Sequence, residues 1–320
     1  MADLEAWGEA GKTYTIHEET LSYFGKSQQL GFRGYSEASP EEGRAATLRR
    51  SELFAGHVDF AGSETQFVVP CEGNDAGVPV SVYKPADVSR VPAIWVYFHG
   101  GGLVVGSRNS YAPMLNRARC MVVNVEYRLA PEHKAPAAFD DCRAATRWVL
   151  QNKTRIGGDA GSQVGIGGDS GGGHLATSVS HDVKGLAFQI LVYPITDLSL
   201  RAPSYAEFES TPGLNTDLVR WFCGQFLVDE SQKKNPVLSP YLRPSFTGLP
   251  PALCILAELD PLRDDAVAYL QKLKEAGVQT ELLMVQGAPH AFFHLFGHFK
   301  ELTKEPYDRV VEFIKRFQKD

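Results

Sequence analysis

The chain has 320 residues, of which 43 % are hydrophobic and 22 % are charged. This is the composition of a globular protein with ample material for a core, in one large or two small domains. The formal net charge of −6 argues against nucleic acid or an anionic membrane as the main partner.

The 5 cysteines are odd in number and scattered without a C-x-x-C pair, so we expect reduced thiols rather than disulfides. The N-terminus is acidic and lacks the apolar segment of a signal peptide. No stretch approaches the roughly 20 apolar residues of a membrane-spanning helix. The sequence therefore predicts a soluble, cytoplasmic protein with no membrane span.

Residues 1–60 show no clear strand pattern. Ser39 is a good N-cap, Pro40 suits the first helical position, and Glu42 can close a capping box, so a helix is predicted from residue 40 onward. We interpret residues 1–60 as a helical arm that contributes to a cap.

Alternation of apolar and polar residues begins near residue 64 and predicts antiparallel strands at 65–70 and 78–84. Residues 93–98 are apolar on both faces, as in a buried central strand. Further helices are expected near 110–119, 136–152, 171–181, 262–276 and 303–318, and further strands at 121–125, 164–167, 186–193, 252–257 and 280–285. This alternation predicts an α/β fold with a mostly parallel central sheet and helices on both faces.

The segment 194–248 interrupts this pattern. It is rich in proline and aromatic residues, contains one expected helix near 214–228, and is too long for an ordinary connection. We predict that it is a cap insertion over the carboxyl edge of the sheet, where open α/β sheets bind ligands. The catalytic core would then comprise 61–193 and 249–320.

The sequence Gly168-Asp-Ser-Gly-Gly172 lies between an expected strand and an expected helix. A serine at such a sharp corner stands clear of its backbone, provided that the residues two before and two after it have almost no side chain. The corner also places Ser170 near a helix N-terminus, which favours a developing negative charge. Ser170 is therefore a candidate nucleophile.

A glycine-rich corner can also bind a dinucleotide. Gly171, Gly173 and Ala176 match the loose dinucleotide pattern, and Asp197 stands where a ribose-binding acid could be. Taken alone, the stretch supports the two interpretations about equally. The remaining motifs favour the nucleophile.

Three glycines follow His99 directly after the buried strand 93–98. They allow the main chain to aim N–H groups at an oxyanion, and the expected donors are Gly101, Gly102 and Gly171. We expect His99 to tie the loop down through its ring nitrogens rather than to act as the base.

An acid and a base follow the serine in the order typical of hydrolases with a nucleophile elbow. Asp260 and His290 each stand just after an expected strand, on the edge where Ser170 lies. The rivals for the acid are Glu258, Asp264 and Asp265, of which the last two would lie in the first turn of a helix.

His290, His294 and His298 recur every fourth residue, but no acidic residue stands among them, and Pro289 and Gly297 interrupt a helix. We therefore expect neither a metal site nor a cofactor.

With these residues in place, the chain resembles the hormone-sensitive-lipase family of α/β-hydrolases, which includes bacterial esterases, plant carboxylesterases and arylacetamide deacetylases. The resemblance covers residues 40–318 and rests on His99-Gly-Gly-Gly102, Glu126-Tyr-Arg-Leu-Ala-Pro-Glu132, Gly168-Asp-Ser-Gly-Gly172, Asp260-Pro-Leu-Arg-Asp264 and His290. It implies an α/β-hydrolase fold with a helical cap. It also maps the family's catalytic triad onto Ser170, Asp260 and His290, and its oxyanion-hole glycines onto Gly101, Gly102 and Gly171.

The chain departs from the family pattern at three positions. Gly171 stands where the family usually has alanine, Leu103 replaces the usual aromatic residue, and Ala291 replaces the usual glycine after the histidine. None of these changes removes a catalytic atom.

The hypothesis is a serine carboxylesterase for small to medium acyl esters. An amide or lactone hydrolase or a deacetylase would use the same residues, and a small-molecule receptor is disfavoured because His290 is present. Candidate substrate contacts are Leu103, Tyr205, Phe208, Trp221 and Phe222. The resemblance also allows a homodimer.

Overall fold

The computed structural model describes residues 4–57, 59–110 and 118–319. Within these ranges the strands form one sheet in the order β1-β2-β4-β3-β5-β6-β7-β8, in which β1 pairs with β2 and β2 with β4 antiparallel while the other pairs are parallel. The strands are β1 (Gly62–Cys71), β2 (Asn74–Pro85), β3 (Ile94–Phe98), β4 (Met121–Val125), β5 (Val164–Asp169), β6 (Gln189–Val192), β7 (Ala252–Leu259) and β8 (Thr280–Pro289).

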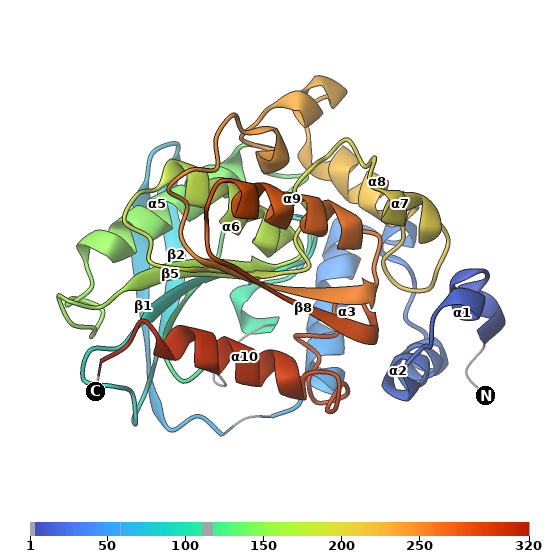
Figure 1. Ribbon diagram of the computed structural model, residues 1–320, viewed down its shortest axis with the longest axis horizontal. Helices are drawn as coiled ribbons and strands as arrows, with labels where there is room; N and C mark the ends of the chain where they lie inside the picture. Colours follow the sequence, from blue (N-terminus) through green and yellow to red (C-terminus); the bar gives the residue numbers. More distant parts are fainter. Residues whose placement is uncertain (1–3, 58, 111–117, 320) are drawn as a thin grey trace.

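Helices cover both faces of this sheet (Figure 1). On one face lie α5 (Ala137–Gln151), α6 (Gly171–Asp182) and α9 (Arg263–Glu275), and on the other face lies α10 (Lys304–Lys315). Because both faces are covered, every residue of β3, β4 and β5 is buried, which explains why β3 is apolar on both of its faces. The predicted α/β architecture with a mostly parallel sheet is confirmed.

The three residues predicted as a catalytic triad each directly follow the end of a strand. Ser170 follows β5, Asp260 follows β7 and His290 follows β8. Since these strands run parallel, their carboxyl ends meet at one edge of the sheet, where open α/β sheets bind ligands.

Residues 4–57 are helical wherever they form regular structure. They contain η1 (Leu4–Trp7), α1 (Ala10–Thr13), α2 (Glu18–Gln29), η2 (Tyr35–Glu37) and α3 (Pro40–Phe54). The predicted capping box is present at the start of α3: the N–H of Glu42 donates to Ser39 Oγ, and the N–H of Ser39 donates to the Glu42 carboxylate at 2.9 Å. Trp7 and Ile16 pack with Phe208 and Leu259, so the start of the chain contacts both the 194–248 insertion and β7.

The insertion contains α7 (Pro203–Glu207), α8 (Thr216–Phe226), η3 (Glu230–Lys234) and η4 (Pro240–Leu242). Most predicted boundaries hold within a few residues. The strand predicted at 186–193 is shorter, because only Gln189–Val192 pair with both neighbouring strands. The helix predicted near 110–119 falls largely on residues outside the described ranges.

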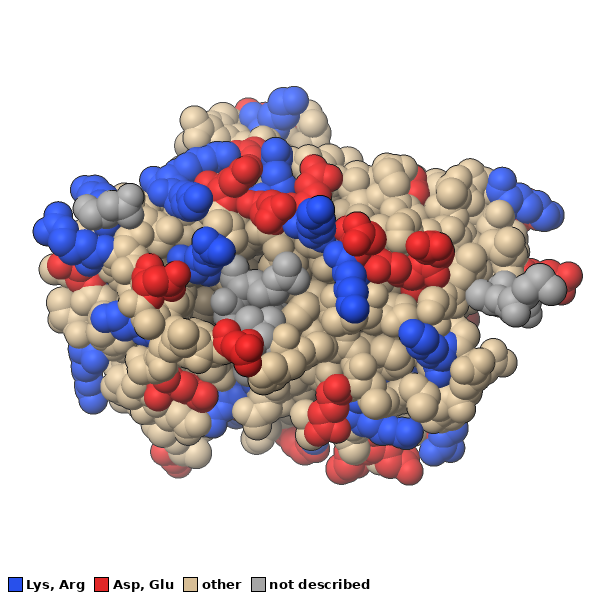
Figure 2. Space-filling model, turned by 90° about the horizontal axis from the view of Figure 1, so that it is seen from below, with Lys and Arg blue, Asp and Glu red and all other residues tan. Residues whose placement is uncertain are grey.

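None of the helices formed by the described residues is long and apolar enough to cross a membrane. On the face shown in Figure 2, basic and acidic side chains are interspersed over the surface.

A buried carboxylate holds the segment that follows β4. Asp141 of α5 is fully buried and accepts hydrogen bonds from the N–H of Arg128 at 2.9 Å and from the Arg128 guanidinium at 2.8 Å. It also accepts from Asn74 Nδ2 at 3.3 Å. The segment 126–132, which carries one of the motifs of the family resemblance, is therefore anchored to the helix behind it.

We predict that Asp141→Asn lowers the free energy of unfolding by about 3 kcal/mol, because it leaves the guanidinium of Arg128 without its counter-charge. Urea unfolding monitored by circular dichroism measures the change. Asp140→Asn is the matched control, since the side chain of Asp140 is 40 % exposed and its ion pair with Arg143 contributes only about 0–1 kcal/mol. Equal effects of the two substitutions would contradict the anchoring role of Asp141.

Candidate active site

Ser170 sits on a strained corner between β5 and α6. Its φ of 54° and ψ of −120° lie in a region that a residue with a side chain rarely adopts. The corner is held by the N–H of Ser170, which donates to the carbonyl of Val192 at 2.9 Å. A Cβ atom on Gly168 or on Gly172 would overlap the carbonyl oxygen of Phe98, so only glycine fits at these two positions.

The structure joins the three residues predicted as a triad in one hydrogen-bonded chain. Ser170 Oγ lies 2.9 Å from His290 Nε2, and His290 Nδ1 lies 2.7 Å from Asp260 Oδ2. The other oxygen of Asp260 accepts the N–H of Leu262 at 2.9 Å. Because the Asp260 side chain is fully buried, it has a fixed orientation toward the imidazole.

The rival acids have other partners. Glu258 lies within β7 and accepts the N–H of Gly287 at 2.8 Å. Asp264 pairs with Arg263, and Asp265 accepts the N–H of Thr196 at 2.8 Å and its hydroxyl at 2.6 Å. Asp265 thus holds the chain just after β6, and burial raises its pKa to about 7.

The glycine loop after β3 turns back toward the corner. Gly101 and Gly102 have φ values of 115° and 59°, in the left-handed region that favours glycine. A Cβ on Gly171 would lie 3.0 Å from the backbone nitrogen of Gly102, so the loop passes directly beside Ser170. No hydrogen-bond acceptor among the described residues takes the N–H of Gly101, Gly102 or Gly171.

The side chain of His99 stabilises the start of this loop. Its ring stacks on Tyr127 with centroids 4.3 Å apart, and its Nδ1 lies 2.8 Å from the carbonyl of Gly100. The hydroxyl of Tyr127 donates to the His99 carbonyl at 2.6 Å. Burial lowers the pKa of His99, so the ring is neutral and serves as a support.

The three histidines that recur at every fourth residue, His290, His294 and His298, lie in three different environments. His290 belongs to the chain with Ser170, His294 Nδ1 lies 3.8 Å from Asp169, and His298 Nε2 lies 2.9 Å from the carbonyl of Glu19. Burial lowers the pKa of His294 to about 3. Among the residues that the structure describes, no group of three histidine, cysteine or acidic side chains could hold a metal ion.

Two residues beside the site were not among the functional residues predicted from the sequence. Asp169 is buried and accepts the hydroxyl of Tyr97 at 2.6 Å, and burial raises its pKa to about 6. The ring of Tyr193 packs against His290 with centroids 4.5 Å apart. Asp169 is the last residue of β5 and lies inside the serine motif, and Tyr193 directly follows β6, so their places at the carboxyl ends of neighbouring strands could have identified them.

Leu103 and Ala291 both lie in the left-handed region, but only Ala291 replaces a residue that the family usually has as glycine. Leu103 has a φ of 62° and Ala291 a φ of 69°. A residue with a Cβ is strained by roughly 1–2 kcal/mol in this region, whereas glycine is not. Ala291 therefore places strain next to His290, at a position where the family usually has glycine.

A cavity of about 930 Å³ opens above Ser170 and His290. Leu103 and Phe222, two of the predicted substrate contacts, line it. Tyr205, Phe208 and Trp221 are not among the described residues of its wall. The structure instead buries Phe208 against Trp7, directs the Tyr205 hydroxyl to Asp265 at 3.3 Å, and packs Trp221 on Phe222.

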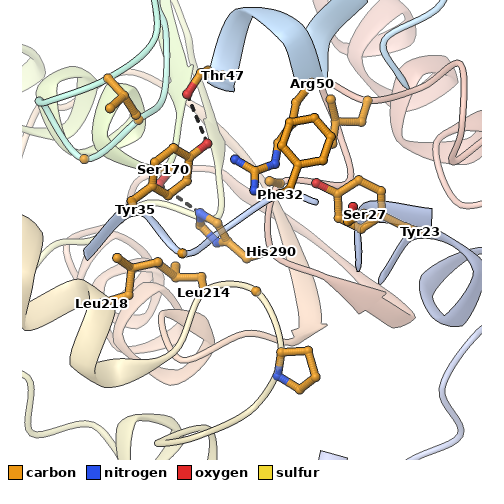
Figure 3. A pocket seen from close by; sticks show the side chains of 18 of the residues that line it. Tyr23, Ser27, Phe32, Tyr35, Thr47, Arg50, Ser170, Leu214, Leu218 and His290 are labelled. Atoms are coloured by element: carbon orange, nitrogen blue, oxygen red, sulfur yellow. Dashed lines mark hydrogen bonds between the residues drawn. The ribbon is translucent and has the colours of Figure 1, made fainter. Parts of the chain in front are cut away.

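The helical arm contributes more of the wall than the sequence indicated. Tyr23, Phe32, Tyr35 and Arg50, from α2, α3 and the segment between them, face the same space as Ser170 and Leu218 (Figure 3). No catalytic motif marks these residues, because their role depends on how the arm packs. The arrangement as a whole is that of a serine hydrolase: a serine bonded to an imidazole, an orienting carboxylate and unused N–H groups beside the serine.

Comparison with known proteins agrees with this class. A family model described as alpha/beta hydrolase fold matches residues 95–294. The chain is 33 % identical to ethyl acetate hydrolase from Pseudomonas putida over 288 residues, which cover 86 % of this chain and 90 % of that protein. It is 39 % identical to carboxylesterase NlhH from Mycobacterium tuberculosis over 217 residues, or 64 % of this chain and 68 % of that protein.

Solved structures show the same likeness. The crystal structure of a thermostable esterase from Pseudomonas putida ECU1011 superposes with a TM-score of 0.87 at 27 % identity, over 95 % of this chain and 98 % of that one. The chain belongs to the α/β hydrolase family, and it is an enzyme of the carboxylic ester hydrolase class. The family and enzyme class predicted from the sequence are confirmed.

We predict that Gly101→Ala lowers kcat/KM for p-nitrophenyl butyrate by about 100-fold or more, the effect of losing a backbone donor at a developing oxyanion. The added Cβ would overlap the carbonyl of Val105 and force the loop away from Ser170. Gly224→Ala in α8 is the control, because its Cβ would meet nothing within 4 Å and the rate should not change. A folded Gly101→Ala enzyme with the wild-type rate would contradict the assignment.

Proposed function

We propose that the protein hydrolyses carboxylic esters of small to medium acyl chains through an acyl-serine intermediate. Ser170 is the nucleophile, His290 the general base and acid, and Asp260 the orienting carboxylate. The observation that carries the proposal is the continuous hydrogen-bonded chain from Asp260 through His290 to Ser170, with distances of 2.7 and 2.9 Å.

The steps follow from this geometry. His290 Nε2 takes the proton of Ser170 as Oγ attacks the ester carbonyl, and the resulting oxyanion accepts the N–H groups of Gly101, Gly102 and Gly171. His290 then donates its proton to the leaving alcohol. A water molecule, deprotonated by the same imidazole, attacks the acyl-serine and releases the acid.

The size of the cavity supports a substrate of moderate size. Its 930 Å³ lie at the upper end of the range for small-molecule sites. We propose that Leu103 and Phe222 contact the substrate, since both line the wall beside the glycine loop. Tyr205, Phe208 and Trp221 would act through the packing of the insertion rather than by contact.

We further propose a division of the chain into functional parts. Residues 61–193 and 249–320 form the catalytic core, 194–248 form a cap insertion, and 1–60 form an arm that completes the cap. The cavity wall supports this division, because it takes residues from α2, α3 and α8 above the carboxyl ends of β5 and β8.

Two expectations about the cellular state complete the proposal. All five cysteines are free, which supports a reducing compartment such as the cytoplasm.

We also propose a homodimer that pairs the exposed edge strand β8, in which Leu282 is 43 % exposed. Light scattering after gel filtration should give twice the mass of the chain, and Leu282→Lys should halve it. A monomeric wild type would refute the dimer.

The central prediction is tested with p-nitrophenyl acetate, butyrate, octanoate and laurate. The wild type should turn them over with a maximum at the short chains, and Ser170→Ala should lower kcat by about 10⁴-fold or more, because the nucleophilic atom is gone. Thermal unfolding of both proteins controls for loss of the fold. Equal and negligible rates for the wild type and Ser170→Ala would contradict the hydrolysis of simple esters. Amides and lactones would then be the substrates to test.

A further inference from the structure

One corner of the cavity carries a positive charge that the proposed mechanism does not use. Tyr23 and Ser27 of α2 and Arg50 of α3 lie together there, on one side of the Ser170–His290 pair (Figure 3). We call these three residues the arginine corner.

The guanidinium of Arg50 is held by rings rather than by a carboxylate. Its central carbon lies 4.3 Å from the centroid of the Phe32 ring and 5.0 Å from that of Tyr35. Nη2 donates to the carbonyl of Arg33 at 3.3 Å, whereas Nη1 is buried and has no hydrogen-bond partner among the described residues. A buried donor on a charged group is unfavourable unless something accepts its hydrogen bond.

Arg44, two turns earlier on α3, shows what a structural arginine looks like in this protein. Its guanidinium binds both oxygens of Glu132 at 2.8 and 2.6 Å, and it also donates to the carbonyls of Val104 and Ala130 at 3.0 Å. These bonds fix α3 to the segment behind the glycine loop. Arg50 therefore stands on a firmly held helix, with its own charge left uncompensated by any ion pair among the described residues.

The rest of the corner also offers donors. The Oγ of Ser27 is buried without a hydrogen-bond partner in the described part of the chain. Burial raises the pKa of Tyr23 to about 12, although the charge of Arg50 lowers it, so the phenol keeps its proton and can donate.

The acidic groups around the cavity do not neutralise this corner. Lys26, Arg33 and Arg50 line the cavity, and the one acidic residue among its described lining residues is Asp169. The carboxyl group of Asp169, next to Ser170 in the chain, already accepts a hydrogen bond from the hydroxyl of Tyr97 at 2.6 Å. The arginine corner thus presents a cation and two hydroxyl groups to the cavity, with no carboxylate opposite them in its described wall.

We propose that Arg50 is a specificity-determining residue that binds a carboxylate on the substrate, so that the preferred esters carry a free acid group remote from the scissile bond. This inference rests on the proposed ester hydrolysis at Ser170. A carboxylate at this wall can pair with the guanidinium of Arg50, and charge-assisted bonds of this kind are strong in a desolvated site. The aromatic rings of Phe32 and Tyr35 would flank the apolar chain that leads to it.

The test compares half esters with neutral esters of the same length. One arm uses monoethyl adipate, suberate and sebacate against ethyl hexanoate, octanoate and decanoate. The other arm uses acetate esters of ω-hydroxy acids against acetates of plain alcohols, which distinguishes a carboxylate on the acyl side from one on the alcohol side. At the matching length, we expect kcat/KM to favour the acidic ester by about 10- to 100-fold, the factor that a charge-assisted hydrogen bond supplies.

Substitutions assign this preference to Arg50. Arg50→Gln should lower the ratio of acidic to neutral kcat/KM by about 10-fold or more, whereas Arg50→Lys, which keeps the charge, should retain part of it. Arg49→Gln is the matched control: Arg49 is an exposed neighbour that does not line the cavity, and its loss should leave the ratio unchanged. Calorimetric titration of Ser170→Ala with suberate reports binding without turnover, and a second substitution at Arg50 should weaken it.

The outcomes separate this inference from the function beneath it. If the wild type hydrolyses neutral esters through Ser170 but shows no acidic preference in either arm, the arginine corner does not bind substrate and the proposed function stands. If Arg50→Gln folds and keeps the full preference, Arg50 is not the cause. If no ester is hydrolysed, the proposed function fails, and suberate binding alone then decides whether the corner is an anion site.

Discussion

The close approach of three main-chain segments at Ser170 is the constraint on which the site depends. The backbone of Gly168 and Gly172 passes so near the carbonyl of Phe98 that no side chain fits. This contact lets the chain reverse sharply between β5 and α6, and it leaves Ser170 with a positive φ that its surroundings must maintain. The glycine loop after β3 passes beside the same corner, so the proposed nucleophile and the proposed donors share one rigid frame.

The parallel sheet supplies the rest of the geometry. Asp260 and His290 lie 90 and 120 residues after Ser170 in the sequence. All three nevertheless stand at the carboxyl ends of strands in the same half of the sheet. Buried polar groups then hold the connecting segments in place: Asp141 anchors the chain after β4, and Asp265 anchors the chain after β6. These carboxylates stabilise the loops around the site without entering the chemistry.

The helical arm supplies the part of the cavity wall that no catalytic motif in the sequence predicts. The motifs beside Ser170 are those of the family apart from three positions. In contrast, α2, α3 and the segment between them bring Tyr23, Phe32, Tyr35 and Arg50 over the cavity. Their contacts make a wall that is aromatic and, at one corner, positively charged. The proposed selectivity therefore rests on a segment that contributes nothing to the hydrogen-bonded chain of the proposed triad.

The sequence by itself determined the class of the fold and the three residues of the proposed triad. Strand and helix periods are local properties, and the spacing of Gly168, Ser170 and Gly172 carries its own steric explanation. The capping box at Ser39 and Glu42 was predictable for the same reason, because all of its hydrogen bonds lie within four residues.

Tertiary structure decided which aromatic residues meet the substrate cavity and which fill the core. Phe222 lines the cavity whereas Phe208 is buried against Trp7, although both lie in the same aromatic-rich insertion. The supporting roles of Asp169 and Tyr193 and the position of Arg50 in the cavity wall also arise from elements that are distant in sequence. Composition and periodicity show that a side chain is apolar or charged, but the packing of α2, α3 and α8 against the sheet determines what that side chain faces.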